Sequence, residues 1–144
     1  MLADIKTRLE ARVVELDGRV GLASDFASVL RGGTAPRGGV NAYILPGTTT
    51  GLPAATLGAG LFIQPVRRGV SIATFLQSTD PRGQRALDRL DDFLADIQQA
   101  ICGWAPGDEV GVFELAVERP APTQNGLMAF VTEFRITDQL RITT

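Results

Sequence analysis

Apolar residues recur at helical spacing near the start of the chain. In residues 2–16 they follow steps of three and four, which places them on one stripe of a helix, and the charged residues fall mostly on the other faces. The stripe consists of Leu2, Ile5, Leu9, Val13 and Leu16. Gly18 is a plausible stop just after this predicted helix. A further short helical turn is predicted within residues 21–30, with Ser24 or Asp25 as its cap.

A second amphipathic helix is predicted over residues 80–102. Asp80 and Pro81 are typical of a helix start, and Gly103 is typical of the position after its end. The apolar stripe consists of Leu87, Leu90, Leu94, Ile97 and Ile101. The polar side carries Asp88, Asp92 and Asp96, a spacing that indicates a solvated helix face more than a metal or acid–base site.

Four segments have the pattern of strands: residues 40–46, 61–78, 110–119 and 126–140. The last two are joined by proline, asparagine and glycine, which is typical of a hairpin. With the two long helices, this order predicts an α+β fold. We expect a two-layer sandwich, in which two helices pack on one face of a roughly four-stranded, mostly antiparallel sheet.

A stretch without charged residues separates the first two predicted strands. It reads "LPGTTTGLPAATLGAG" over residues 45–60 and has neither helical nor strand periodicity, so a long loop is predicted at about 46–60. No acidic residue occurs between Gly38 and Thr79, where the only charges are Arg67 and Arg68. A compact domain rarely keeps such a loop unless the loop binds something or is disordered.

Composition indicates one globular domain spanning residues 1–144, with ordinary proportions of apolar and charged residues and a net charge of −2. Histidine is absent, which excludes a Ser-His-Asp or Cys-His site and a Cys/His zinc site within the chain. No apolar run is long enough for a membrane span, and no signal peptide is recognisable, so a soluble protein of the cytoplasm is expected.

The candidates for chemistry are few. Gly58-Ala59-Gly60 lacks the third glycine and the following helix of a dinucleotide fingerprint. Cys102 lies beside the apolar stripe, and a buried structural thiol is favoured over a nucleophile because no base can be named. The glycine-rich residues 31–39 favour a flexible connector over an RNA-binding tract. We therefore predict no catalytic residue, no cofactor and no metal.

The order of these segments resembles the phage tail terminators of the long-tailed (siphophage) type, in particular those of Mu-like and related prophages. The resemblance rests on "VNAYILP", "VSIATFLQ", "DPRGQRALDRLDDFLADIQQAICGWAP" and the closing "FELAVERP" and "NGLMAFVTEFRIT" segments, and it spans about residues 2–137. Its most specific element is the helix that runs into Gly103-Trp104-Ala105-Pro106.

The resemblance implies a non-enzymatic virion protein that forms a hexameric ring, caps the tail tube, ends its polymerisation and receives the head. Its partners would be further copies of itself, the tail tube protein and neck or connector proteins. DNA would only pass through the channel, and no membrane would be involved. The protein would be assembled in the cytoplasm of the host bacterium and reside at the tail–neck junction. Similar proteins act in gene transfer particles.

The uncharged loop and the arginines after it then become the candidate interface, which orders on docking against the tube or a ring neighbour. The residues concerned are Thr48, Thr49, Thr50, Leu52, Leu57, Arg67 and Arg68. Two alternatives stay open. One is another neck or head-completion protein of the same particle, and the other is a small enzyme that uses Asp88 or Cys102.

Overall fold

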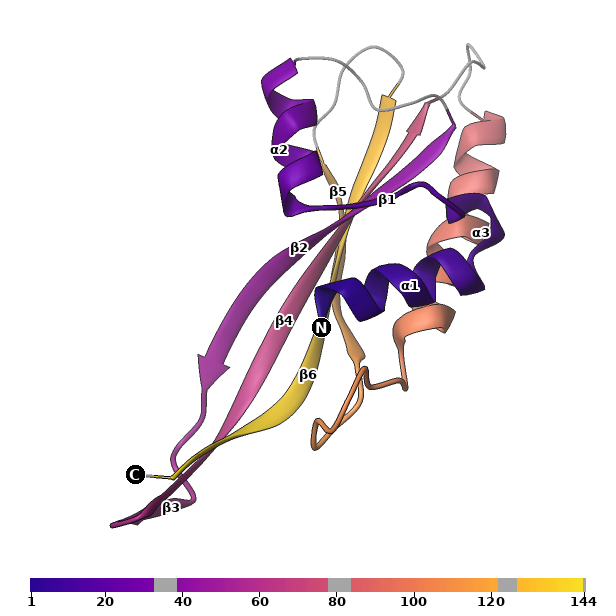
Figure 1. The fold of residues 1–144 in the computed structure, drawn as a ribbon. Coiled ribbons are helices and arrows are strands. Elements are labelled where there is room, and N and C mark those ends of the chain that lie inside the picture. Colours follow the sequence, from indigo (N-terminus) through magenta and orange to yellow (C-terminus); the bar gives the residue numbers. More distant parts are fainter. Residues whose placement is uncertain (33–38, 78–83, 122–126, 144) are drawn as a thin grey trace.

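The computed structural model of the chain describes residues 1–32, 39–77, 84–121 and 127–143 (Figure 1). The helices in these ranges are α1 (Leu2–Arg12), the short 3-10 helix η1 (Val14–Leu16), α2 (Ala23–Gly32) and α3 (Gln84–Ile101). The strands are β1 (Val20–Leu22), β2 (Val40–Gly51), β3 (Thr56–Gly58), β4 (Leu61–Gln77), β5 (Glu114–Ala121) and β6 (Leu127–Thr143). The predicted α+β class is confirmed.

The strands form one sheet in the order β1-β2-β4-β6-β5, and the short β3 pairs with the start of β4. The main path therefore has five strands instead of four. The sheet is mixed, because β1 runs parallel to β2 and the other pairs are antiparallel. β4 and β6 stay in register from Leu61 opposite Thr143 to Gln77 opposite Leu127. This long ladder carries the sheet beyond the helices, and we call residues 49–66 and 138–143 the distal arm (Figure 1).

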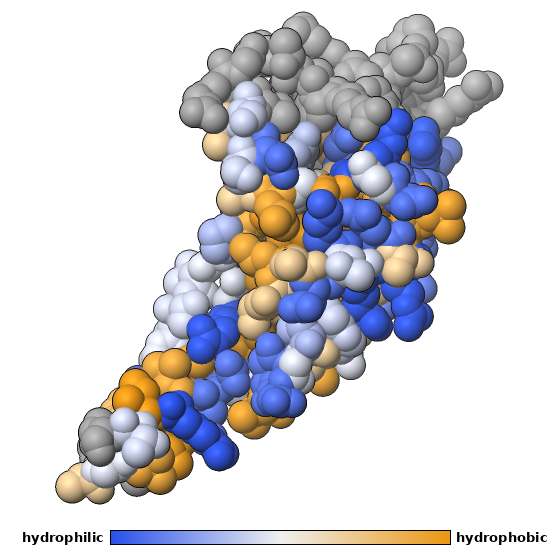
Figure 2. All heavy atoms as spheres, in the orientation of Figure 1, coloured by the Kyte–Doolittle hydropathy of each residue, from blue (hydrophilic) through white to orange (hydrophobic). Residues whose placement is uncertain are grey.

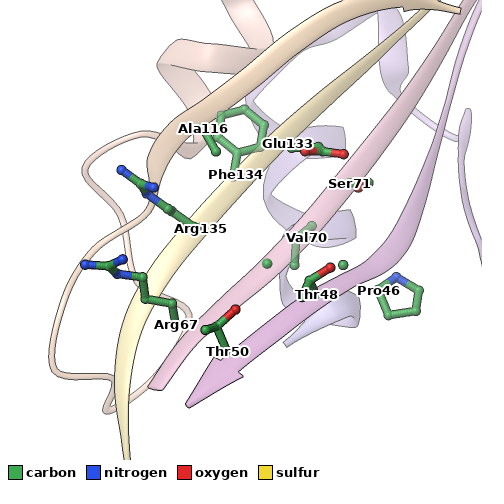
Figure 3. A pocket seen from close by; sticks show the side chains of 12 residues that line it. Pro46, Thr48, Thr50, Arg67, Val70, Ser71, Ala116, Glu133, Phe134 and Arg135 are labelled. Carbon is green, nitrogen blue, oxygen red and sulfur yellow. The ribbon is translucent and has the colours of Figure 1, made fainter. Parts of the chain in front are cut away.

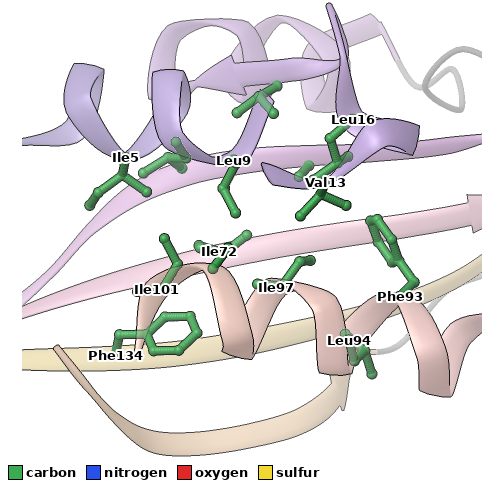
Figure 4. Close-up of a cluster of buried hydrophobic side chains, with 14 of the residues drawn as sticks. Ile5, Leu9, Val13, Leu16, Ile72, Phe93, Leu94, Ile97, Ile101 and Phe134 are labelled. Carbon is green, nitrogen blue, oxygen red and sulfur yellow. The ribbon is translucent and has the colours of Figure 1, made fainter. Parts of the chain in front are cut away.

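The core lies between one face of the sheet and the helices α1 and α3, which also contact each other (Figure 4). Side chains from both predicted stripes are fully enclosed there, together with sheet residues; they include Ile5, Leu9, Ile97, Ile101, Ile72 and Phe134. The predicted apolar stripes are thus confirmed at these positions. α1 is shorter than the predicted helix, because Val13 has an extended backbone conformation (φ −113°, ψ 101°). The chain continues as η1, and Leu16, the last residue of the predicted stripe, is still buried there.

α2 covers the opposite face of the sheet, at the end that carries β1. The Phe26 ring lies 5.6 Å from the ring of Tyr43 and 6.2 Å from that of Phe75. Tyr43 and Phe75 alternate along their strands with the core residues Ala42 and Thr74, so they point away from α1 and α3. The predicted pair of helices on one face is present, and the chain adds a third helix on the other face.

One strand boundary differs from the prediction because of local hydrogen bonds, and two further predicted features fall outside the described residues. The strand expected from residue 110 begins at Glu114, since Phe113 exchanges backbone hydrogen bonds with Gly103 and Trp104 at the end of α3. Gly103 has a φ of +80°, as expected for the residue after a helix. The predicted caps Asp80 and Pro81 and most of the glycine-rich connector, residues 33–38, lie outside the described residues.

The predicted loop at 46–60 is wrong for most of its length. β2 continues through Pro46 to Gly51, residues 52–55 make the connection, and β3 follows at Thr56–Gly58. The reason lies in β4, which supplies ladder partners to this segment, from Pro46 opposite Val70 to Gly51 opposite Val66. Pairing with a long neighbouring strand overrides the weak strand propensity of glycine and proline.

Candidate interaction surface

A concave pocket of about 620 Å³ opens on the sheet face opposite α1 and α3 (Figure 3). Four strands contribute to it, and its polar lining comes from Thr48, Thr50, Arg67, Ser71, Glu133 and Arg135. In β4 and β6 these residues alternate with members of the core such as Ile72 and Phe134, which fixes their side chains on the open face. Three of the predicted interface residues, Thr48, Thr50 and Arg67, line this pocket.

A β-bulge shapes the β2 side of the pocket. Pro46 lies opposite Val70 and Thr49 lies opposite Arg68, so Gly47 and Thr48 together face the single residue Gly69. The bulge changes which residues of β2 point to each face. It lets both Thr48 and Thr50 line the pocket, while Thr49 pairs with Arg68 on the other face.

The two predicted arginines lie on opposite faces of the sheet. Arg68 is half-buried on the face that α1 and α3 cover elsewhere, and its Nε lies 3.0 Å from Oδ2 of Asp138. Arg67 is exposed on the open face, and within the described residues it has no carboxylate partner. Arg68 therefore helps to hold β4 to β6, whereas Arg67 is available to a ligand or a partner.

Two exposed ion pairs flank Arg67 on the same face. Arg135 Nε lies 3.5 Å from Oε1 of Glu114, and Arg119 Nη1 lies 2.9 Å from Oε1 of Glu133. Pairs this exposed contribute little to folding stability, so their side chains can rearrange when a partner binds. The alternating pattern of β6 predicts that Glu133 and Arg135 share one face of the sheet. That they lie near Arg67 follows only from the pairing of β6 with β4.

The remaining predicted interface residues lie in the distal arm. Leu52 is half-buried: its amide donates to the carbonyl of Pro65 over 2.9 Å, and its own carbonyl accepts from Gln64 Nε2 at 2.8 Å. Leu57 pairs with Phe62 in the β3–β4 hairpin, and its side chain lies outside the described ones. The structure thus brings Thr48, Thr50 and Arg67 together and places the other residues in the arm or on the opposite face.

The candidates for catalysis are dispersed. Cys102 is exposed, so the expectation of a buried thiol is wrong: the residue follows the last helical position and turns away from the core. Asp88, Asp92 and Asp96 are exposed on the outer side of α3, as predicted for a solvated face. No group of acidic or cysteine side chains suited to a metal occurs within the described residues. In the same part of the chain, no helix is both long and apolar enough to cross a membrane.

Within the described residues, the open sheet face thus carries an arginine without a carboxylate partner, next to an arm that extends beyond the helices. Comparison with known proteins identifies the family of the chain. No curated protein matches the chain, but a protein-family model described as "Phage tail terminator protein" matches residues 2–144. Because the match covers nearly the whole chain, this protein belongs to the phage tail terminator family.

Proposed function

We propose that the protein forms a hexameric ring that caps the tail tube, ends its polymerisation and provides the surface to which the head is joined. Membership of the family makes the chain a structural phage tail protein that contacts other tail components, and such proteins are not typically enzymes. In this proposal the partners are neighbouring copies, the tube protein and neck or connector proteins. DNA passes through the channel without sequence-specific binding. The place of action is the tail–neck junction, after assembly in the host cytoplasm.

The observation that carries this proposal is the apolar distal arm. Apolar side chains gather at its end, where Leu61 is 42% exposed and Ile142 is 48% exposed (Figure 2). The arm has no charged residue from Thr49 to Val66, and α1 and α3 cover a different part of the sheet. Ile142 is paired with Phe62, the neighbour of Leu61, so Leu61 and Ile142 expose apolar surface on both faces of the arm's end. Exposed apolar surface of this kind marks a site of association.

The arm is suited to a contact with the tube or with a ring neighbour. The small, uncharged residues of its β2 and β3 strands allow close approach, and this edge needs no charge to be neutralised on docking, whereas β6 carries the exposed Arg141. In a ring, identical weak contacts act together, so the combined affinity far exceeds that of one arm. The proposed interface comprises Thr48, Thr49, Thr50, Leu52, Leu57 and Arg67, with Arg68 supporting the strands from the other face.

The test changes the end of the arm and leaves the core intact. A phage that carries Leu61→Asp with Ile142→Asp should assemble overlong or unjoined tails, scored by electron microscopy and by infectivity. The matched control is Val14→Asp, which is also an exposed apolar residue (88%) but lies outside the arm, in η1. Normal tail lengths and normal titres with the double variant would contradict the proposal.

The alternative is another neck or head-completion protein of the phage or of a gene transfer particle. Its loss would leave tails of normal length that are not joined to heads. Labelled protein located on the portal side of the junction, away from the end of the tube, would favour this alternative.

A further inference from the structure

We propose that the open sheet face around Arg67 and Arg135 docks onto the acidic outer side of α3 in a neighbouring copy of this chain. This inference rests on the proposed ring and specifies the contact that would build it. Its cationic half lies in the pocket of Figure 3, where the two arginine side chains extend side by side in the same direction.

Around the arginine pair, the described residues of this face carry one more positive than negative charge: Arg67, Arg119 and Arg135 against Glu114 and Glu133. Arg67 lies opposite Thr137, two positions from Arg135, so the two are diagonal neighbours on adjacent strands, with backbones about 7–8 Å apart. Only Arg135 has a carboxylate partner among the described residues, and that partner, Glu114, is exposed. Two like charges at this separation repel each other, and an anionic partner would relieve the repulsion.

The acidic half lies on α3. Asp91, Asp92 and Asp96 are exposed, and within the described residues none of them forms an ion pair. Asp92 and Asp96 are one helical turn apart, about 6 Å along the axis, which is close to the separation of the two arginines. Exposed Ala95 lies between these carboxylates. On the arginine side, Ala116 lines the pocket and Val117 is 44% exposed, so each half also offers small apolar surface.

The orientation of the two halves selects a second copy as the partner. α3 packs on the core face of the sheet and turns its acidic side away from the sheet, whereas the arginine pair points out of the opposite face. One subunit cannot bring these surfaces together. When copies are arranged head to tail, the arginine face of each copy meets the acidic side of α3 in the next. Such contacts close into a ring when the rotation from one copy to the next is a whole fraction of a full turn.

The test is a charge reversal with rescue, scored by mass photometry and sedimentation velocity in solution and by binding to purified tail tubes. Arg67→Glu with Arg135→Glu should weaken self-association about tenfold or more, and Asp92→Arg with Asp96→Arg should do the same. A chain that carries all four changes has complementary charges again and should reassemble. The matched control, Arg12→Glu with Glu15→Arg, reverses two exposed charges near the end of α1 and should assemble like the unmodified protein.

The outcomes separate this contact from the ring itself. If rings form normally in both reversed variants, or if the four-change chain stays folded but does not reassemble, the contact is overturned while the ring stands. If the unmodified chain assembles neither in solution nor on tubes, both the proposed function and this inference are overturned. If the arginine reversal abolishes binding to a DNA duplex and leaves the ring intact, the arginines serve phosphate binding and the inference is overturned.

Discussion

Gly47 and Gly69 meet backbone to backbone across the β-bulge between β2 and β4. A Cβ atom on Gly47 would lie 2.7 Å from the carbonyl carbon of Gly69, and one on Gly69 would lie 2.8 Å from the carbonyl oxygen of Thr48. Separations this short are not tolerated between non-bonded atoms, and the obstructing atoms belong to the backbone. The point at which the sheet passes from the core region to the distal arm therefore requires glycine on both strands.

Replacement of Gly69 by alanine should destabilise the protein by about 1–3 kcal/mol, because the added methyl group forces the bulge to shift. Gly58→Ala is the matched control, since Gly58 is also a strand glycine and a Cβ there would meet nothing within 4 Å. Its free energy of unfolding should change by no more than about 0.5 kcal/mol. Urea denaturation measures both values, and equal effects would contradict the close contact described for Gly69.

Alkaline pH should destabilise the fold through Tyr43. Burial, with a smaller effect from the Asp25 carboxylate, raises the pKa of the Tyr43 hydroxyl above its usual value of about 10. Below pH about 10 both the folded and the unfolded chain keep the phenolic proton, so stability is complete. As pH rises toward the raised pKa, the unfolded chain loses the proton first, and the free energy of unfolding falls.

The measurement is direct because Tyr43 is the chain's single tyrosine, so tyrosinate absorbance reports on this residue alone. Urea unfolding at increasing pH should show a decline that is smaller in Tyr43→Phe, which keeps the ring but has no proton to lose. An apparent pKa near that of free tyrosine, or equal declines in both proteins, would count against this assignment.

Glu118 connects α3 to the sheet through one carboxylate oxygen. Its Oε2 accepts from the hydroxyl of Thr132 and from Nε2 of Gln98, each over 3.0 Å, and Thr132 is fully buried. Glu118→Ala leaves the Thr132 hydroxyl without this acceptor and should cost about 1–3 kcal/mol. Glu118→Ala combined with Thr132→Val removes both partners and should cost less than the single change. Thermal unfolding compares the two, and a larger loss in the combined variant would show that the hydroxyl has another acceptor.

The Arg8 guanidinium joins α1 to the end of α3. It lies 4.7 Å from the centre of the Trp104 ring, and its Nε donates to the carbonyl of Ala100. Arg8→Lys keeps the charge but loses the planar stacking and this donor, and it should cost about 1–2 kcal/mol. Because Trp104 is the only tryptophan, its fluorescence should change as well. Arg12→Lys, at an exposed site on the same helix, is the control and should leave both the stability and the emission unchanged.

The sequence was sufficient to predict the helices and the residues they bury. Apolar residues at steps of three and four lie on one side of a helix, so each predicted helix has a single side that can face the core. The structure buries that side in both helices, at Ile5, Leu9, Ile97 and Ile101. The three-residue strand β1 could not be found in this way, because it is too short to show a period and is defined only by its parallel pairing with β2.

The candidate surface was predictable only in part. The uncharged stretch after Leu45 lies partly in the pocket and partly in the arm, but its strand conformation depends on pairing with β4 and on the bulge at Gly47. Alternation along β6 also does not reveal which residue of β4 lies opposite Arg135. A shift of one residue in that pairing would move Arg135 to the other face, so register is a property of the folded sheet.

The ladder between β4 and β6 also has a mechanical consequence. It pairs Leu61 with Thr143 at the end of the arm and Gln77 with Leu127 in the region of the core, without a shift of register. A pull along the strands at the end of the arm would load these bonds together in shear and would not peel them apart one by one. The arm is therefore built as a stiff lever that can transmit force along β4 and β6 to the core beneath the helices.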